Sequence, residues 1–146
     1  MPGPVTTAED TSVAIAGLSV DDVNGNLVSV ALSVLQGTLQ VDLAGGASVS
    51  AGANSSAALT LAGSQAQINA ALASLQYQGS GNYNGGNTLS LTATDATALT
   101  SSGTVPLTVT AVNDPPMLTT PAPQLVTEDG TLTLSNATGN AIIVAD

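Results

Sequence analysis

The sequence predicts an all-β protein, a β-sandwich with one short helix. Two observations lead to this fold class. Runs of alternating apolar and polar residues recur about seven times, with turn signals roughly every ten residues. Only one stretch, residues 64–75, spaces its apolar residues as a helix does. The apolar residues make up 43% of the chain but include no Phe and no Trp, so the core must be built mainly from small aliphatic side chains.

The first half of the chain is typical of strands separated by tight turns. Alternation predicts strands over residues 11–16, 27–34, 38–43, 47–50 and 57–61. In the second of these strands, Val and Leu at every other position share one face. Because Gln36-Gly37 can turn the chain sharply, we expect the second and third strands to form a hairpin.

The stretch from Ser64 to Leu75 predicts the single helix. Ile68, Leu72 and Leu75 recur at helical spacing, and Ser64 with Gln67 forms a capping box, in which each residue satisfies a backbone donor of the other. We expect about three turns of helix over one end of the sandwich.

The remaining elements are a loop and two strands. Gly and Asn predict a loop over residues 77–86, followed by strands over 89–95 and 104–112. Asn113-Asp114-Pro115-Pro116 then ends the last strand, because proline lacks a backbone donor and restricts the residue before it.

A second copy of the start of the chain follows this linker. Pro2–Thr11 aligns without gaps with Pro121–Gly130, and both copies continue with alternating apolar residues. The sequence therefore predicts a complete repeat over residues 1–112, a linker over 113–116, and the beginning of a second repeat over 117–146. Residues 117–146 lack the strands that would bury them, so we expect this segment to be poorly ordered or to borrow partners.

The charge composition excludes whole classes of function. The chain has ten acidic residues and no Lys, Arg or His, a net charge of −10. Binding to nucleic acid or to an anionic membrane surface requires cationic side chains. Catalysis by a His or Lys base and activation of Ser by His are equally ruled out. We therefore expect no enzyme, no nucleic-acid partner and no membrane insertion, since no apolar run approaches the ~18 residues of a membrane span.

The acidic residues gather at strand ends and junctions. Six of the ten form adjacent pairs, at positions 9–10, 21–22 and 128–129. Two carboxylates about 4 Å apart repel each other by roughly 4 kcal/mol at an effective dielectric constant near 20. A cation from solution would relieve that repulsion, and an all-oxygen ligand set favours Ca2+. The residues alone leave a second interpretation open, in which these side chains are solvated turn residues that keep the domain soluble.

An ordered set of short motifs resembles the cadherin-like, VCBS-like tandem repeats of giant bacterial RTX-type adhesins. The motifs are Val20-Asp21-Asp22-Val23-Asn24-Gly25-Asn26, Gln67–Tyr77, Asn82-Tyr83-Asn84-Gly85, Thr92–Asp95, Val112–Pro116 and Thr127–Thr131. The resemblance implies a Greek-key β-sandwich of the cadherin or Ig type. It also implies Ca2+ at the seams where two repeats meet.

Carrying the resemblance over residue by residue gives two groups of metal ligands. The group at the seam between the two repeats is Glu9, Asp10, Asn113, Asp114 and Asp146. The group at the opposite end is Asp22, Asn24 and Asp95. Two departures from the family pattern stand out: the Asp-Arg-Glu element of animal cadherins is missing, and Asn24 stands where a second Asp usually falls.

The resemblance implies a structural spacer repeat of a large secreted bacterial adhesin, a protein of cell adhesion and biofilm, in which Ca2+ stiffens the fibre. Its partners would be neighbouring repeats of the same chain, together with homotypic contacts. The site of action would be extracellular, on the bacterial cell surface, after export by a signal outside this fragment. The alternative is a ligand-binding or homotypic adhesion module for carbohydrate or protein, with Tyr77 and Tyr83 as its only aromatic side chains.

Overall fold

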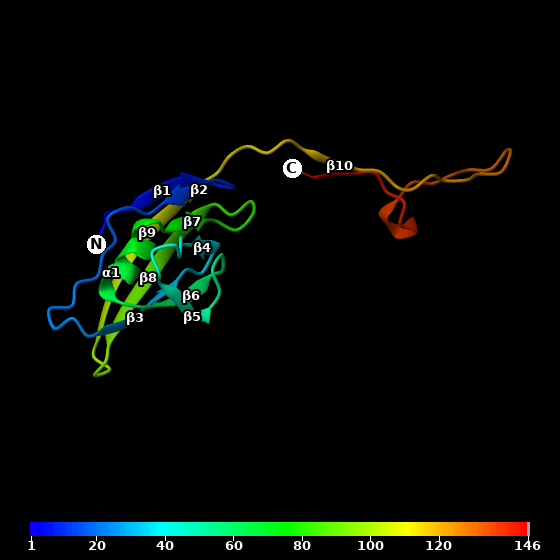
Figure 1. Cartoon of the computed structure of the whole chain (residues 1–146). Coiled ribbons are helices and arrows are strands. Elements are labelled where there is room, and N and C mark those ends of the chain that lie inside the picture. Colours follow the sequence, from blue (N-terminus) through cyan, green and yellow to red (C-terminus); the bar gives the residue numbers. More distant parts are fainter. Residues whose placement is uncertain (146) are drawn as a thin grey trace. The chain divides into compact units, whose positions relative to one another are not determined.

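The computed structural model describes residues 1–145 and divides into two compact units, Met1–Val112 (unit 1) and Asn113–Asp146 (unit 2) (Figure 1). The strands of unit 1 are β1 (Val5–Ala8), β2 (Ser12–Ala14), β3 (Leu27–Ser33), β4 (Thr38–Gln40), β5 (Ser48–Gly52), β6 (Ala58–Ala62), β7 (Gln76–Gln78), β8 (Gly85–Asp95) and β9 (Thr100–Thr110). Its helix is α1 (Gln65–Ala73). Unit 2 contains β10 (Met117–Thr119), the short 3-10 helix η1 (Asn136–Thr138) and β11 (Ile143–Ala145).

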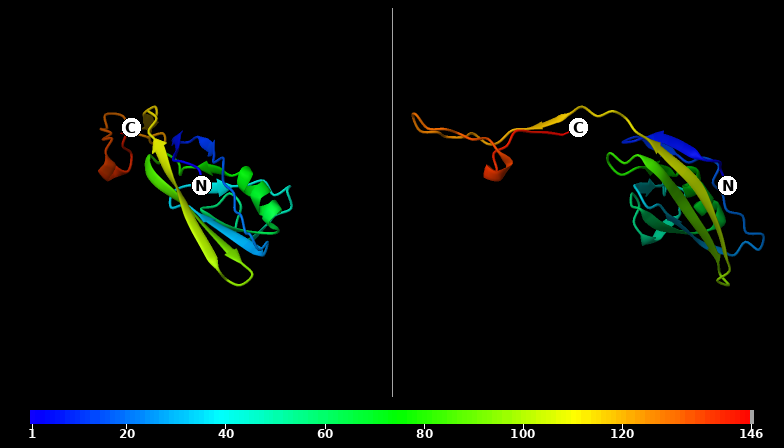
Figure 2. Two further views of the ribbon diagram at one scale, coloured as in Figure 1. Left: turned by 90° about the vertical axis from the view of Figure 1, so that its left-hand side faces the viewer. Right: turned by 180° about the vertical axis from the view of Figure 1, so that it is seen from behind.

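Unit 1 is an all-β sandwich with one helix, which confirms the predicted fold class. One sheet has six strands in the order β1-β9-β8-β3-β6-β5, and the other has three in the order β2-β7-β4. Figure 2 shows the long β8–β9 hairpin running through unit 1. Apolar side chains of both sheets and of α1 meet in a single core.

The first segment of the chain belongs to both sheets. β1 pairs in parallel with β9, and β2 then pairs antiparallel with β7. Between them the backbone turns at Asp10, whose φ of 57° is left-handed. Asp tolerates this conformation better than most residues because its short polar side chain forms local hydrogen bonds. Residues 5–14 therefore tie one sheet to the other.

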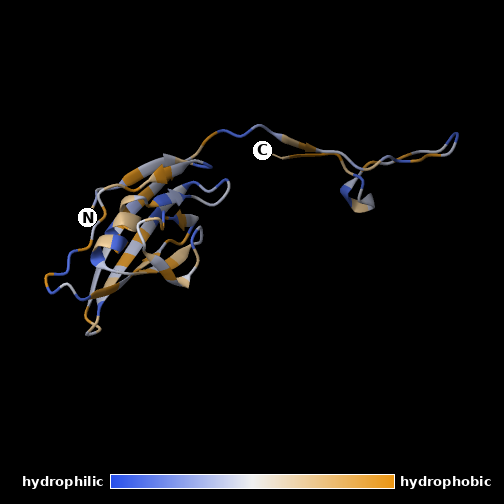
Figure 3. Cartoon of the chain, in the orientation of Figure 1, coloured by the Kyte–Doolittle hydropathy of each residue, from blue (hydrophilic) through white to orange (hydrophobic). Residues whose placement is uncertain are grey.

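The core is filled by every second residue of the strands. Along β9, for example, Val105, Leu107 and Val109 are buried while their neighbours are exposed, an alternation visible as orange bands in Figure 3. Tyr77 is the largest fully buried side chain. Its hydroxyl donates to the carbonyl oxygen of Gln36 (2.9 Å) and lies 3.0 Å from the Asn87 amide nitrogen, so the buried polar group is satisfied.

The predicted hairpin between residues 27–34 and 38–43 is wrong. β3 pairs with β6 and β8, whereas β4 pairs with β7 in the other sheet. The crossing is made at Gly37, whose φ is +102° and where a Cβ atom would lie 2.1 Å from the Gln78 carbonyl oxygen. The glycine therefore marks a close approach of two backbones as the chain changes sheet.

The helix matches its prediction closely. The Ser64 hydroxyl accepts from the Gln67 N–H, and the Gln67 side chain accepts from the Ser64 N–H (2.8 Å), so the capping box is formed. Ile68, Ala71 and Leu72 are its buried residues. β1 and β7 were not predicted, and β8 and β9 begin earlier than the pattern indicates, at Gly85 and Thr100.

Unit 2 has much less secondary structure than unit 1. Within its described residues, 113–145, one ladder joins β10 and β11, and all six residues of this ladder are exposed. Among residues 113–145, no large apolar side chain is buried. Asp129 has a φ of 63°, close to the 57° of its counterpart Asp10, so the two copies share this local turn. None of the helices in residues 1–145 is long and apolar enough to cross a membrane.

Candidate functional site: an acidic pocket at one end of the sandwich

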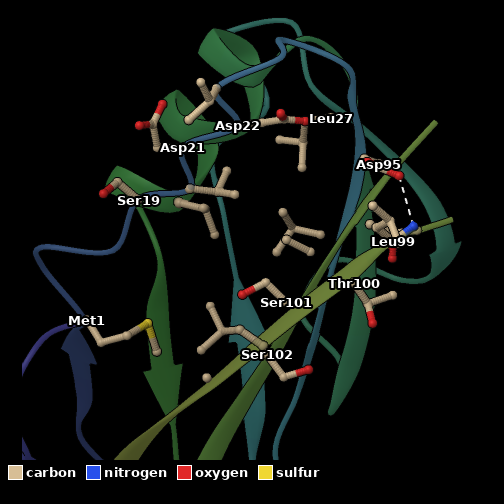
Figure 4. Close-up of a pocket in the computed structure, with 18 residues that line it drawn as sticks. Met1, Ser19, Asp21, Asp22, Leu27, Asp95, Leu99, Thr100, Ser101 and Ser102 are labelled. Carbon is tan, nitrogen blue, oxygen red and sulfur yellow. Dashed lines mark hydrogen bonds between the residues drawn. The ribbon is translucent and has the colours of Figure 1, made fainter. Parts of the chain in front are cut away.

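Unit 1 has a pocket of about 450 Å³ between the segment before β3 and the β8–β9 hairpin (Figure 4). Its apolar lining includes Val20, Leu27, Val30, Leu72, Leu91 and Leu99. Its polar lining residues include Ser19, Thr94, Thr100, Ser101 and Ser102, and the acidic residues Asp21, Asp22 and Asp95. The pocket thus joins an apolar surface to three acidic groups, in a chain without a single Lys, Arg or His.

The helix holds one wall of this pocket in place. Residues 17–26 form no strand, and Asn69 of α1 takes over the role of a strand partner there. Its side-chain oxygen accepts from the Val20 N–H (2.8 Å), and its amide donates to the Val20 carbonyl (2.9 Å). Gln65, one turn earlier, accepts from the Asp22 N–H (3.1 Å) and donates to the Asp21 carboxylate (3.0 Å). Both acids are therefore positioned by the first turns of the helix.

Only one of the two carboxylate oxygens of Asp22 has a hydrogen-bond partner among the described residues. One carboxylate oxygen accepts from the Asn24 N–H (2.9 Å), which closes a local turn. The other oxygen, Oδ2, is buried and has no hydrogen-bond partner in the part of the chain that the structure describes. The side-chain oxygen of Asn26 is in the same state. An unsatisfied buried acceptor costs about 1–3 kcal/mol, and more when it is charged.

Asp95, at the end of β8, is held by donors of the β8–β9 turn. Its Oδ1 accepts from the N–H groups of Thr97 (2.8 Å) and Leu99 (2.9 Å), and Figure 4 marks the bond to Leu99. These bonds, that from Leu99 foremost, hold the pKa of Asp95 below its ordinary value, with further help from the side chains of Thr97 and Asn26. Asp95 therefore stays ionised in mildly acidic solution.

The predicted metal ligands of unit 1 fall into two places. Asp22 and Asp95 line the same pocket, whereas Asn24 lies in the neighbouring turn and does not line it. Glu9 and Asp10 lie in the turn between β1 and β2. Glu9 is only 6% exposed, and its carboxylate accepts from the N–H of Val112 and the amide of Asn84.

The other predicted ligands lie outside unit 1. Asn113 and Asp114 belong to unit 2, where the Asn113 amide donates to the Asp114 carbonyl. Asp146 lies outside the described residues. Among residues 1–145, no three Asp, Glu, His or Cys side chains form a group that could hold a metal ion. The assignments of individual ligand residues, and of Ca2+ itself, stay predictions.

Four residues of this site were missed by the sequence interpretation. Asp21 and Asn26 line or border the pocket, while Gln65 and Asn69 position its wall. A signal for the last two was present, because amide side chains spaced i and i+4 beside a buried helix face lie over whatever that face covers. No local pattern identifies the backbone segment that they bind.

The fold and the pocket define a small all-β sandwich module with an acidic, partly apolar recess at one end. A protein-family model then identifies it further: the Protein GAMETE EXPRESSED 2 domain matches residues 9–105, well over half of the chain. The chain belongs to that family. Searches of curated proteins and of solved structures gave no significant match.

This family membership corrects the resemblance drawn from the motifs. The chain is not a cadherin-like, VCBS-like repeat of a bacterial RTX-type adhesin, because the matching family is that of a gamete-expressed protein. The predicted function as a calcium-stiffened spacer of a bacterial fibre, with its associated roles in biofilm and cell adhesion, is likewise wrong, and no calcium-binding cluster supports it among residues 1–145. The motifs did not identify the family, because sequences such as Asn-Asp-Pro-Pro and Asp/Asn-Gly form turns in unrelated β-sandwiches as well.

Proposed function

We propose that unit 1 is a non-enzymatic protein-binding module of a gamete-expressed protein, and that its pocket receives a basic side chain of a partner protein. The supporting observation is the pocket itself, which places Asp21, Asp22 and Asp95 beside an apolar lining. The family name supplies the gamete context. The proposal includes an extracellular site of action, with neither nucleic acid nor membrane insertion involved.

The chemistry of the pocket favours Lys or Arg over other ligands. A long basic side chain has an aliphatic stem and a charged head. The stem would lie on Leu27, Leu91 and Leu99, and the head would approach the carboxylates at the rim. The chain offers these acids no Lys, Arg or His side chain, so a partner's basic side chain would have no competing side chain of this kind within the chain.

The net charge extends this preference beyond the pocket. A domain that carries only negative charge attracts a basic surface over about a Debye length, roughly 8–10 Å at physiological salt. Such attraction increases the association rate more than it strengthens the affinity. We therefore expect a partner with a basic patch, and association that slows as salt concentration rises.

Peptide binding tests the proposal. The full chain is titrated with Lys- or Arg-containing peptides and with matched peptides in which Gln replaces the basic residue. Asp21→Asn and Asp22→Asn should each weaken binding of the basic peptides about two- to fivefold, the range of a partly exposed ion pair. Asp42→Asn is the matched control, because it removes one charge on another face of the domain. Equal weakening by all three variants, or equal binding of the Gln peptides, would refute the pocket as the site.

A further inference from the structure

Unit 1 contains two Asn-Gly pairs, and the fold places them in different surroundings. Asn24-Gly25 lies in the turn before β3, whereas Asn84-Gly85 lies where β8 begins. An Asn followed by Gly is open to deamidation, because Gly has no Cβ to shield its backbone nitrogen from the Asn side chain. The two pairs carry the same reacting groups, so a difference in their reactivity would come from the fold.

The turn at Asn24 leaves the reacting groups accessible. Asn24 and Gly25 are both exposed, and a Cβ at Gly25 would have no neighbour within 4 Å apart from the adjoining residues. The side-chain amide of Asn24 makes no hydrogen bond to the rest of residues 1–145. The Gly25 N–H donates to the Asp22 carbonyl (3.0 Å), so this bond within one exposed turn must open before the nitrogen can react.

The surroundings of Asn84 hold the same groups in place. The Asn84 amide donates to the Glu9 carboxylate (3.4 Å), and Gly85 lies opposite Val109 in the β8–β9 ladder. A Cβ at Gly85 would lie 3.3 Å from the Tyr83 hydroxyl, so this backbone is also crowded. Deamidation requires the Asn side chain and backbone to rotate toward each other, which the ladder and the Glu9 contact resist. We therefore expect Asn84 to react much more slowly than Asn24.

We propose that Asn24 is a site of spontaneous modification in the folded protein, where deamidation through Gly25 gives aspartate and isoaspartate. The Gly25 nitrogen attacks Cγ of Asn24, so that a N–Cγ bond forms and the Cγ–Nδ2 bond breaks. The amide nitrogen leaves as ammonia with the proton of the Gly25 N–H. Water from the solvent then opens the cyclic succinimide. Attack of water at Cγ gives aspartate, and attack at the backbone carbonyl carbon gives isoaspartate.

Either product changes the turn that holds Asp22 at the pocket. The Asn24 N–H donates to Oδ1 of Asp22 (2.9 Å), and both products place a new carboxylate beside this bond. Aspartate leaves the backbone as it was. Isoaspartate lengthens the main chain by one atom, because the chain then runs through Cβ and Cγ, and this displaces the Gly25 N–H from the Asp22 carbonyl. The effect on the pocket rests on the proposed function, whereas the modification does not.

Peptide mapping of the full chain tests the modification. A protease that cleaves before Asp suits a chain without Lys or Arg, and it releases residues 22–41 and 42–94 as separate peptides, one for each Asn-Gly pair. The folded protein is incubated at mildly alkaline pH, where hydroxide removes the Gly25 amide proton, and is sampled over weeks. Tandem mass spectrometry should find deamidation at Asn24 severalfold faster than at Asn84. The aspartate product becomes a new cleavage site for the protease, and the isoaspartate product does not.

Unfolding supplies the matched control. In concentrated denaturant the two Asn-Gly pairs lose their different surroundings and should deamidate at nearly equal rates. Gly25→Ala should slow the reaction of Asn24 severalfold in the folded and the unfolded chain, because the added Cβ shields the nitrogen. Equal rates at Asn24 and Asn84 in the folded protein, a faster reaction at Asn84, or a folded Asn24 that does not react would each overturn the proposal.

Peptide binding tests the effect on the pocket. Anion exchange separates the aged molecules, because each carries an additional negative charge. The fraction that contains isoaspartate should bind Lys or Arg peptides about two- to fivefold more weakly than fresh protein, the loss expected of Asp22→Asn. Asn24→Asp adds the charge without lengthening the backbone and should not weaken binding.

The two measurements fail separately. If aged and fresh protein bind basic peptides equally, the effect on the pocket is refuted while the modification stands. If fresh protein binds no basic peptide, the proposed function and the effect on the pocket both fail, and the peptide map still decides whether Asn24 is modified.

Discussion

At the scale of single residues, Glu9 is the acidic side chain most tightly built into unit 1. It is buried, it joins the β1–β2 turn to the end of β9, and its own N–H donates to the Thr110 carbonyl (2.9 Å). We expect Glu9→Ala to lower the free energy of unfolding by about 1.5–3 kcal/mol, the range for a hydrogen bond to a charged group. Glu128→Ala, at the equivalent and exposed position of unit 2, should leave the unfolding of unit 1 unchanged. Denaturant titration measures both, and equal losses would contradict the assigned role.

Asp95 gives a pH-dependent prediction at the same scale. Its folded-state pKa lies below its ordinary value because the Leu99 and Thr97 donors stabilise the carboxylate. A lowered pKa stabilises the fold fully above the unfolded pKa of about 3.9, and that contribution is lost as pH falls through the folded pKa. Asp95→Asn should therefore lower Tm at pH 7, and the Tm difference from the wild type should shrink toward zero as pH falls below the ordinary pKa and through the lowered folded-state pKa. A difference that stays constant over this range would contradict the prediction.

At the scale of elements, α1 both covers the core and shapes the pocket. Asn69→Ala removes two hydrogen bonds to the Val20 backbone and should cost about 2–3 kcal/mol. It should also weaken peptide binding, because Asp21 and Asp22 lose their support. Ser64→Ala breaks the capping box and should cost about 1 kcal/mol without changing binding. Thermal melts and the peptide titration together distinguish the two effects, and equal loss of binding in both variants would refute the positioning role of Asn69.

The elements that sequence predicts well are those whose signal is local. The helix is one, since Ser64, Gln67 and Ile68 determine its start and its buried face without help from distant residues. β7 is the opposite case: it has three residues, Gln76, Tyr77 and Gln78, and becomes a strand only because β2 and β4 lie on either side of it. The pocket depends on such distant pairings as well. Asp22 and Asp95 were predicted to face the same end of the domain, but the contribution of Asn69 depends on tertiary contacts that no local pattern contains.

At the scale of the whole molecule, the two units differ in how much apolar surface they bury. Unit 1 has a continuous core, whereas residues 113–145 bury no large apolar side chain. In dilute solution we expect slow amide hydrogen exchange in β3, β8 and β9 and fast exchange throughout residues 113–145. Hydrogen-exchange mass spectrometry measures this directly. Strong protection of residues 113–145 at low concentration would contradict it.

The parallel pairing of β1 with β9 has a mechanical consequence. β1 lies near the N-terminal end of the unit 1 chain and β9 near its C-terminal end, and the two paired strands run in the same direction. A force that pulls those ends apart therefore slides one strand along the other and loads the hydrogen bonds of the ladder together, instead of opening them one after another. Forced unfolding is governed by the rate of crossing that barrier rather than by equilibrium stability. A domain with a modest core of Val, Leu and Ala can thus withstand tension better than its melting temperature indicates, which single-molecule stretching of unit 1 between its ends would measure.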